Sequence, residues 1–173
     1  MAKRVADRDV SLGMAGEVEL PEGLVAEPFL DDEVVGIAAA RRLKARRAGV
    51  AVGKLAGQTL LVRERGSSTR TVSERYLART GYRPAKRWEL DSNEAIKRSV
   101  AAGLGIGFLS SRVVEDELAR GELVSFGVEG VEPMHRSIYL LRPDGREPIP
   151  AERAFIETLC RCCSASVAGC TVT

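Results

Sequence analysis

Residues 63–70 are the segment best suited to binding chemistry, and they read Arg-Glu-Arg-Gly-Ser-Ser-Thr-Arg. The apolar run before them predicts a strand, Gly66 permits a turn, and Ser67 or Ser68 can begin a helix. A helix start offers free N–H groups and a positive dipole end to an anion, and hydroxyl groups and arginines add directional donors. We therefore expect a site for a carboxylate, sulfate or phosphate. A serine that only caps the helix gives the same pattern, and both interpretations stay open here.

A second glycine-rich segment, Gly103-Leu-Gly-Ile-Gly107, does not predict a nucleotide site. These glycines follow a predicted helix and precede a predicted strand, whereas a dinucleotide fingerprint has the reverse order. A phosphate-binding loop is not indicated either, because Gly53 and Lys54 are followed by leucine. We expect the glycines at 103–107 to end a helix and to permit a close backbone approach.

Catalytic and metal chemistry find little support in the sequence. His135 is the only histidine, which excludes any metal site or catalytic triad that needs two. The four cysteines lie in the last fourteen residues with the spacing C-x-C-C-x6-C, which no common zinc module has. The acidic runs at 31–32 and 115–117 are expected to be solvated. We predict no catalytic residue, no metal ligand and no cofactor.

The composition is that of a soluble globular chain. Of 173 residues, 45% are hydrophobic and 29% are charged, and the formal net charge is +2. So small an excess does not indicate a nucleic-acid surface, and no apolar stretch approaches the length of a membrane span. Five of the first ten residues are charged and no apolar stretch follows them, so a signal peptide is not indicated and we expect a cytoplasmic protein with no membrane partner. Trp88, in a predicted strand, is expected in the core, and the basic run at 41–47 is expected to be a solvated loop.

Strands and helices alternate along the chain, which predicts an α/β fold with a mostly parallel sheet. Expected strands are residues 9–14, 24–29, 33–40, 59–62, 86–90, 106–109, 123–126 and 136–141. Expected helices run from Ser67 or Ser68 to Gly81, from a capping box of Asp91 and Glu94 to Gly103, from Ser110 or Ser111 to Gly121, and from Pro150 onward.

Two lobes joined by a hinge are expected, because the chain leaves one compact part, builds a second and returns. We expect residues 1–57 with 132–163 to form a first, incomplete lobe and residues 58–131 to form a second lobe. Residues 164–173 are small and polar and are expected to be a disordered tail.

Several segments together resemble the effector-binding domain of LysR-type transcriptional regulators. They include DVSLGMAG, KLAGQTLLVRERGSSTR and, most specifically, ELDSNEAIKRSVAAGLGIGFLSSRVVEDELARGELV. The resemblance implies a fold like type 2 periplasmic binding proteins, with a small anionic effector between two lobes, and no enzymatic activity. It also implies a homodimer or higher oligomer. The family's winged helix-turn-helix and the start of its first lobe have no counterpart here, so DNA binding is expected only through a domain absent from this chain.

Carried over by position, the resemblance implies effector contacts at Gly66, Ser67, Ser68 and Thr69, with Arg65 and the segment Leu104–Phe108 nearby, of which Phe108 is the expected contact. Two other functions stay open at this point. One is a free-standing small-molecule binding protein of the same fold. The other is a small α/β transferase or hydrolase that uses Ser67 or Ser68 as a nucleophile.

Overall fold

The structure, a computed structural model, describes residues 1–17, 19–43 and 49–163 and divides into two compact units. The central unit is Glu33–His135, and the discontinuous unit combines Met1–Asp32 with the segment from Arg136 onward. The described residues among 33–57 and 132–135, which the sequence assigns to the first lobe, thus belong to the central unit. The predicted tail at 164–173 lies outside the described residues, and the functional division into lobes stays a prediction.

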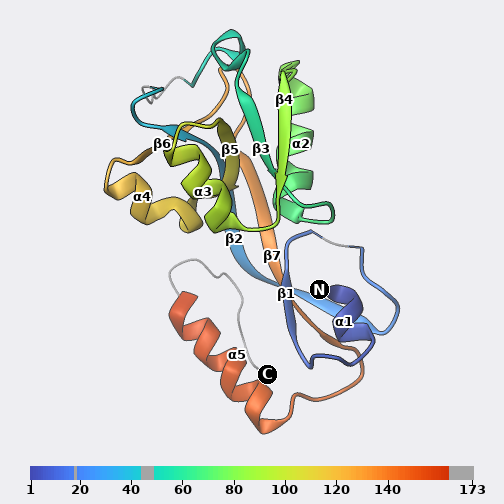
Figure 1. The fold of residues 1–173 in the computed structure, drawn as a ribbon. Helices are drawn as coiled ribbons and strands as arrows, with labels where there is room; N and C mark the ends of the chain where they lie inside the picture. Colours follow the sequence, from blue (N-terminus) through green and yellow to red (C-terminus); the bar gives the residue numbers. More distant parts are fainter. Residues whose placement is uncertain (18, 44–48, 164–173) are drawn as a thin grey trace. The chain divides into compact units, whose positions relative to one another are not determined.

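The central unit is built on a mixed sheet (Figure 1). β3 (Thr59–Arg63) pairs in parallel with β4 (Lys86–Leu90) and β5 (Ile106–Ser110), while β2 (Leu24–Ala39) pairs antiparallel with β5 and β6 (Leu123–Phe126). Parallel pairing is therefore confined to β3, β4 and β5 among the described strand pairs. The expected strands at 24–29 and 33–40 form one continuous strand, Leu24–Ala39, which runs through Asp31 and Asp32 without a turn.

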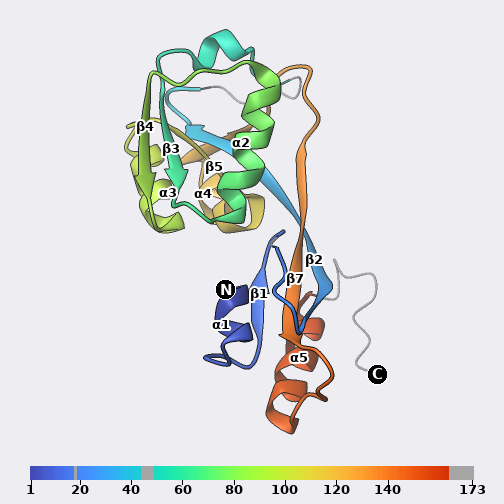
Figure 2. The same cartoon turned by 90° about the vertical axis from the view of Figure 1, so that its right-hand side faces the viewer.

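Helices cover both faces of this sheet, as the alternation along β3 requires (Figure 2). Leu60 and Val62 pack in a core with Val72, Tyr76 and Leu77 of α2 (Ser68–Thr80). Leu61 points to the other face and packs with Ile96 and Val100 of α3 (Asn93–Ala101). The sheet therefore holds the start of α2 at the carboxyl end of β3, where the sequence predicts the anion site.

The helix ends follow the local sequence, with one correction. Gly81 ends α2 in the left-handed conformation, as predicted. The N-cap of α3 is Ser92 and not Asp91, because the Ser92 hydroxyl accepts the Ala95 N–H at 3.4 Å. The third predicted helix begins as a 3-10 turn, Ser111–Val114, and continues as α4 (Glu115–Ala119). A short 3-10 helix, Val52–Leu55, precedes β3.

The glycine-rich segment after α3 permits a close backbone approach, as predicted. A Cβ at position 105 would lie 2.2 Å from the Thr59 carbonyl oxygen, so only glycine fits beside the start of β3. Gly103 has a φ of +81°, which favours glycine. The Arg41 guanidinium donates to the Ala102 carbonyl at 2.6 Å and so satisfies the end of α3. Arg41 is therefore a structural contact, whereas residues 44–47 of the basic run lie outside the described part.

Trp88 is exposed, and its predicted core position is wrong. The indole lies in β4 at the end of the strand order and is 45% exposed. The reason is that β4 is an edge strand, and its residues at 86–89 are all exposed.

The discontinuous unit has its own apolar contacts. It contains α1 (Ala2–Ala6), β1 (Gly13–Ala15), the first half of β2, most of β7 (Met134–Pro143) and α5 (Pro150–Cys163). β1 pairs antiparallel with β7, and Val5 packs against Leu141. The predicted strand at 9–14 is thus shortened to three residues, and α1 was not predicted. No described helix is long and apolar enough to cross a membrane.

A buried ion pair links the neighbouring strands β2 and β7 within this unit. The Arg136 Nη2 lies 2.7 Å and its Nε 2.8 Å from Asp32 Oδ2. The two side chains are 7% and 3% exposed, respectively. A second pair on the same strands, Arg142 with Glu27 at 2.6 Å, is partly exposed.

Candidate functional site

The candidate site is the turn that joins β3 to α2. Gly66 has a φ of +86°, which favours glycine, and the Ser67 N–H donates to the Glu64 carbonyl at 3.2 Å. The chain therefore reverses tightly and begins α2 beside the carboxyl end of β3. Parallel strands of α/β sheets place ligand sites at this edge, and the first turn of a helix leaves N–H groups without intrahelical acceptors.

Two side chains at this turn have no partner within the described part of the chain. Ser67 occupies the N-cap position, but its hydroxyl makes no capping hydrogen bond. Its carbonyl accepts hydrogen bonds from the N–H and the hydroxyl of Thr71. Arg65 is exposed and forms no described hydrogen bond or ion pair. Ser68 is half-buried and Thr69 is buried, and both already have partners. The purely capping interpretation of Ser67 is therefore not supported by its geometry.

Arg63, at the end of β3, is fully engaged by the protein itself. Its Nε and Nη2 donate to the two carboxylate oxygens of Glu64 at 2.7 and 2.8 Å, and its Nη1 donates to Asn93 Oδ1. Because Arg63 donates to it, the pKa of Glu64 is lowered. The bidentate pair with Glu64 fixes the guanidinium, and the bond to Asn93 ties the end of β3 to the start of α3.

Arg70, in the first turn of α2, is engaged in the same way. It donates to Glu89 at 2.6 Å, to Glu74 at 3.1 Å and to the Arg63 carbonyl at 3.1 Å. The hydrogen bond that Arg70 donates to Glu89 raises the pKa of Arg70. The guanidinium groups of Arg63 and Arg70 are thus occupied by protein acceptors and are not available to an anion, although the sequence pattern allowed this. Arg65 is therefore the available cation of the turn.

Phe108 lies apart from the turn residues. It is 4% exposed in β5, and its ring packs against Tyr76 and Phe126 with centroid distances of 6.0 and 5.8 Å. It therefore belongs to the core beneath α2, and its contact with an effector stays a prediction that these contacts do not favour. The structure brings together Arg65, Gly66, Ser67, Ser68 and Thr69.

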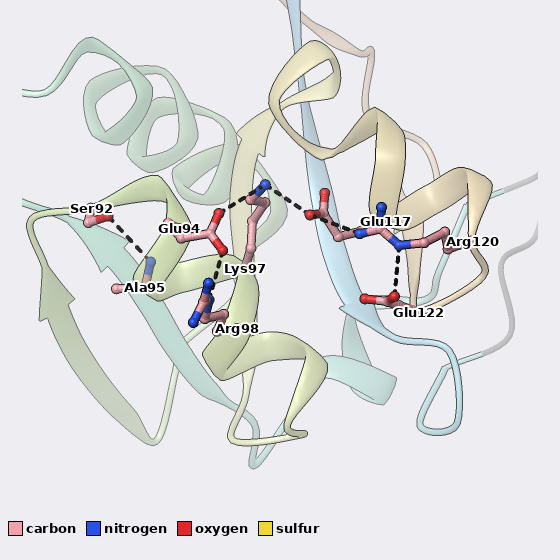
Figure 3. Close-up of polar contacts among 8 residues, drawn as sticks. All are labelled: Ser92, Glu94, Ala95, Lys97, Arg98, Glu117, Arg120 and Glu122. Carbon is pink, nitrogen blue, oxygen red and sulfur yellow. Dashed lines mark hydrogen bonds and ion pairs between the residues drawn. The ribbon is translucent and has the colours of Figure 1, made fainter.

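A second polar cluster braces α3 against α4 (Figure 3). Lys97 lies 3.2 Å from Glu94 and 2.9 Å from Glu117, and Arg120 joins Glu117 to Glu122. The ammonium of Lys97 lowers the pKa of Glu117 by its hydrogen bond, although burial opposes this. The second carboxylate oxygen of Glu117 is buried without a partner. The cluster holds α3 in place, and with it Asn93, which contacts Arg63.

The sequence reasoning missed the carboxylates and the amide that engage the arginines. Glu64, Glu89 and Asn93 all lie at the carboxyl ends of strands or just after them. That shared position was the available signal, because the carboxyl ends of parallel strands meet at one edge of a sheet. Among the residues the structure describes, no group of three or more acidic, histidine or cysteine side chains is arranged to hold a metal.

A family model described as LysR substrate binding domain matches residues 1–162. The chain belongs to the LysR substrate-binding domain family. The RuBisCO operon transcriptional regulator of Acidithiobacillus ferrooxidans is 33% identical over 159 residues, which cover 92% of this chain and 51% of that protein. The regulator CbbR of Cereibacter sphaeroides is 42% identical over 132 residues, which cover 76% of this chain and 38% of that protein. This LysR domain thus spans about half the length, or less, of these curated relatives, and the family is regulatory and not enzymatic.

Solved structures agree with the family. The regulatory domain of Synechocystis PCC6803 CcmR, in complex with 2-PG, has a TM-score of 0.79 at 28% identity and covers 93% of this chain and 77% of that chain. The effector-binding domain of QuiR, in complex with shikimate, has a TM-score of 0.75 at 18% identity and covers 94% of this chain and 76% of that chain. At this identity, the similarity supports the fold alone. The LysR domain therefore has the periplasmic-binding-protein-like fold that the family resemblance implied, and it is an effector-binding domain similar to that of CbbR regulators.

Proposed function

We propose that this LysR domain senses a small anionic metabolite at the N-terminal end of α2. The observation that carries the proposal is a pair of donors, the Arg65 guanidinium and the Ser67 hydroxyl, that have no partner among the described residues and lie beside the first turn of a 13-residue helix. Charge-assisted hydrogen bonds from such donors select for an anion. Ser68, Thr69 and the glycine turn at Gly66 complete the proposed contact surface.

The proposed ligand class is a phosphorylated carboxylate. One similar solved domain was determined with 2-PG, 2-phosphoglycolate, and two relatives are named RuBisCO operon transcriptional regulators. A phosphate suits the N–H groups of a helix start, and a planar guanidinium can hold either a phosphate or a carboxylate with two parallel bonds. Both ends of such a ligand thus have chemically matched donors at this turn.

The proposed mechanism is a shift of population and involves no covalent chemistry. An effector changes an equilibrium only by binding one conformation more tightly than another. The curated relatives are named HTH-type transcriptional regulators, so we propose that binding here biases the state of an oligomeric regulator on DNA. In this proposal, DNA is recognised by the winged-helix region of such regulators, which lies outside the residues that this chain shares with them.

The test is calorimetric titration of the protein with 2-phosphoglycolate, with inorganic phosphate and shikimate as separate ligands. Ser67→Ala and Arg65→Gln should each weaken binding of 2-phosphoglycolate about tenfold to hundredfold, since a hydrogen bond to a charged group contributes about 1.5–3 kcal/mol. Ser99→Ala, near the end of α3, and Arg79→Gln, near the end of α2, are the matched controls and should bind like the parent.

Thermal melting of the same variants separates binding from folding. Because the Ser67 hydroxyl makes no capping bond, Ser67→Ala should melt close to the parent without ligand, and only the stabilisation by ligand should shrink. Equal binding of 2-phosphoglycolate by the parent, Ser67→Ala and Arg65→Gln would show that the ligand does not use this turn. No binding of any of the three anions by the parent would reject the proposed ligand class.

A further inference from the structure

A hollow of about 260 Å³ lies in the central unit, at the edge of the sheet where β2 ends and β3 begins. Its walls come from the turn after β2 at Arg42 and Leu43, from residues 49–51 and Lys54 before β3, and from Glu129 after β6. This volume is several times the roughly 30 Å³ of a water molecule, and it is slightly below the roughly 300 Å³ at which pockets for drug-sized ligands begin. The hollow therefore suits a small ligand and not a dinucleotide.

A smaller hollow of about 30 Å³ adjoins the first one, because Arg42, Leu43 and Lys54 line both. This inner hollow reaches the half-buried Gln58, just before β3, and the buried Ile106 at the start of β5. It has room for water but for no larger group. The two cations thus lie beside a depression that extends inward to the sheet, and not on a flat surface.

The two cations of this hollow have no counter-charge within the described part of the chain. Arg42 and Lys54 are exposed, and they form no ion pair and no side-chain hydrogen bond with the described residues. Glu129 is the one acidic side chain in the described lining, and it pairs with neither cation. Two like charges beside one hollow repel each other, and an anion between them relieves that repulsion. The charges of the hollow therefore favour an anionic ligand.

Backbone contacts fix the two segments that carry these cations. The Arg42 N–H donates to the Ala39 carbonyl at 2.8 Å, which closes a turn directly after β2. The Lys54 N–H donates to the Ala51 carbonyl at 2.9 Å, and the next residue, Leu55, is 1% exposed and anchors the 3-10 helix in the core. Both cations are thus carried by ordered backbone, so binding an anion costs side-chain entropy but little backbone entropy.

Arg42 has a competing explanation at the end of α3. A Cβ at position 103 would lie 3.0 Å from the Arg42 Nε, so the guanidinium is close to the carboxyl end of that helix. The helix dipole favours a cation there. This role does not account for Lys54, which comes from a different segment and lines the same hollow.

We propose that this hollow binds a small phosphate-bearing anion, at a site separate from the turn between β3 and α2. A guanidinium offers a planar pair of donors and an ammonium offers a point charge, and phosphate oxygens accept from both. The hollow precedes the first residue of β3, whereas the turn follows the last one, and a five-residue strand is about 15 Å long. A ligand small enough for the hollow therefore does not reach the turn.

Titration calorimetry with pyrophosphate at constant ionic strength tests the hollow. The reference protein carries Arg65→Gln and Ser67→Ala, so that the turn contributes no binding. In this reference, Arg42→Gln and Lys54→Gln should each weaken pyrophosphate binding about fivefold to tenfold, since each removes a charge-assisted contact at an exposed site. Lys86→Gln removes the same charge from β4, away from the hollow, and should bind like the reference.

Glu129→Gln gives a change of opposite sign. It removes a carboxylate that repels the anion, so pyrophosphate should bind this variant more tightly than the reference. Amide chemical shifts then locate the ligand without any substitution in the hollow: pyrophosphate should move the signals of Ala51 and Lys54 and leave that of Gly81, at the far end of α2, in place.

Three results would overturn the proposal. The first is a reference protein that binds no pyrophosphate, and the second is a set of amide shifts confined to residues outside the hollow. The third is Arg42→Gln with a lowered thermal midpoint but unchanged pyrophosphate binding, together with unchanged binding in Lys54→Gln. That third result would show that Arg42 serves only the end of α3.

Discussion

The buried ion pair between Asp32 and Arg136 provides the sharpest test of what stabilises the discontinuous unit. Two N···O distances of 2.7 and 2.8 Å join side chains that are almost completely buried. Replacing Arg136 with methionine leaves the carboxylate of Asp32 buried without its cation. Removing one partner of a buried pair costs about 3–5 kcal/mol, because the remaining charge keeps its desolvation penalty.

Arg142→Met is the matched control for this perturbation. Arg142 and Glu27 lie on the same two strands at a similar distance, but both side chains are partly exposed. An exposed pair contributes about 0–1 kcal/mol, since water screens the charge that remains. The free energy of unfolding in urea, followed by far-UV circular dichroism, should therefore fall several times more in Arg136→Met than in Arg142→Met.

The double variant Asp32→Leu with Arg136→Met completes the argument. It removes both charges, so most of the stability lost in Arg136→Met should return. Equal losses in Arg136→Met and Arg142→Met would show that burial does not set the cost of these pairs. A double variant less stable than either single variant would show that the pair is favourable even against apolar packing.

Three further outcomes test other parts of the structure. Gly105→Ala should destabilise the central unit at the upper end of about 1–3 kcal/mol, because a Cβ meets the Thr59 carbonyl at 2.2 Å; a urea midpoint like the parent's would contradict this. Ser92→Ala should cost about 1 kcal/mol through the lost N-cap bond, and a thermal midpoint equal to the parent's would refute that role. Arg146 lowers the pKa of Glu152 by its hydrogen bond, so the carboxylate stabilises the fold above its unfolded pKa, and that contribution is lost as pH falls through its folded pKa. Unfolding measured from neutral to acidic pH should show this loss in the parent and a smaller one in Glu152→Gln.

The order of strands and helices in the central unit could be predicted from the sequence because its signals are local. The apolar run of β3, the glycine that ends α2 and the hydroxyl residues before α3 all act within a few residues of the chain. Trp88 could not be placed, because an apolar residue in a strand is buried or exposed according to whether that strand lies at an edge. The sheet order decides this, and it depends on pairings between distant segments.

The candidate site was predictable to the same extent. The turn at Gly66 and the N-cap at Ser67 follow from adjacent residues. The partners of Arg63 and Arg70 do not, since Glu89 and Asn93 reach these arginines only after β4 and α3 have joined the sheet. Sequence patterns thus predict where donors lie along the chain, whereas the fold decides which of them the protein itself occupies.

The division of the chain into one contiguous and one discontinuous unit has a consequence for the order of folding. Every residue of the central unit, Glu33–His135, is synthesised before the residues of β7 that pair with β1. Pairing of Gly13 with Leu141 must close a loop that holds the whole central unit, and contacts between such distant residues form slowly. A central unit that folds first shortens that loop to the distance between its own two ends. We therefore expect the early-made strand β1 to stay unpaired until late in synthesis.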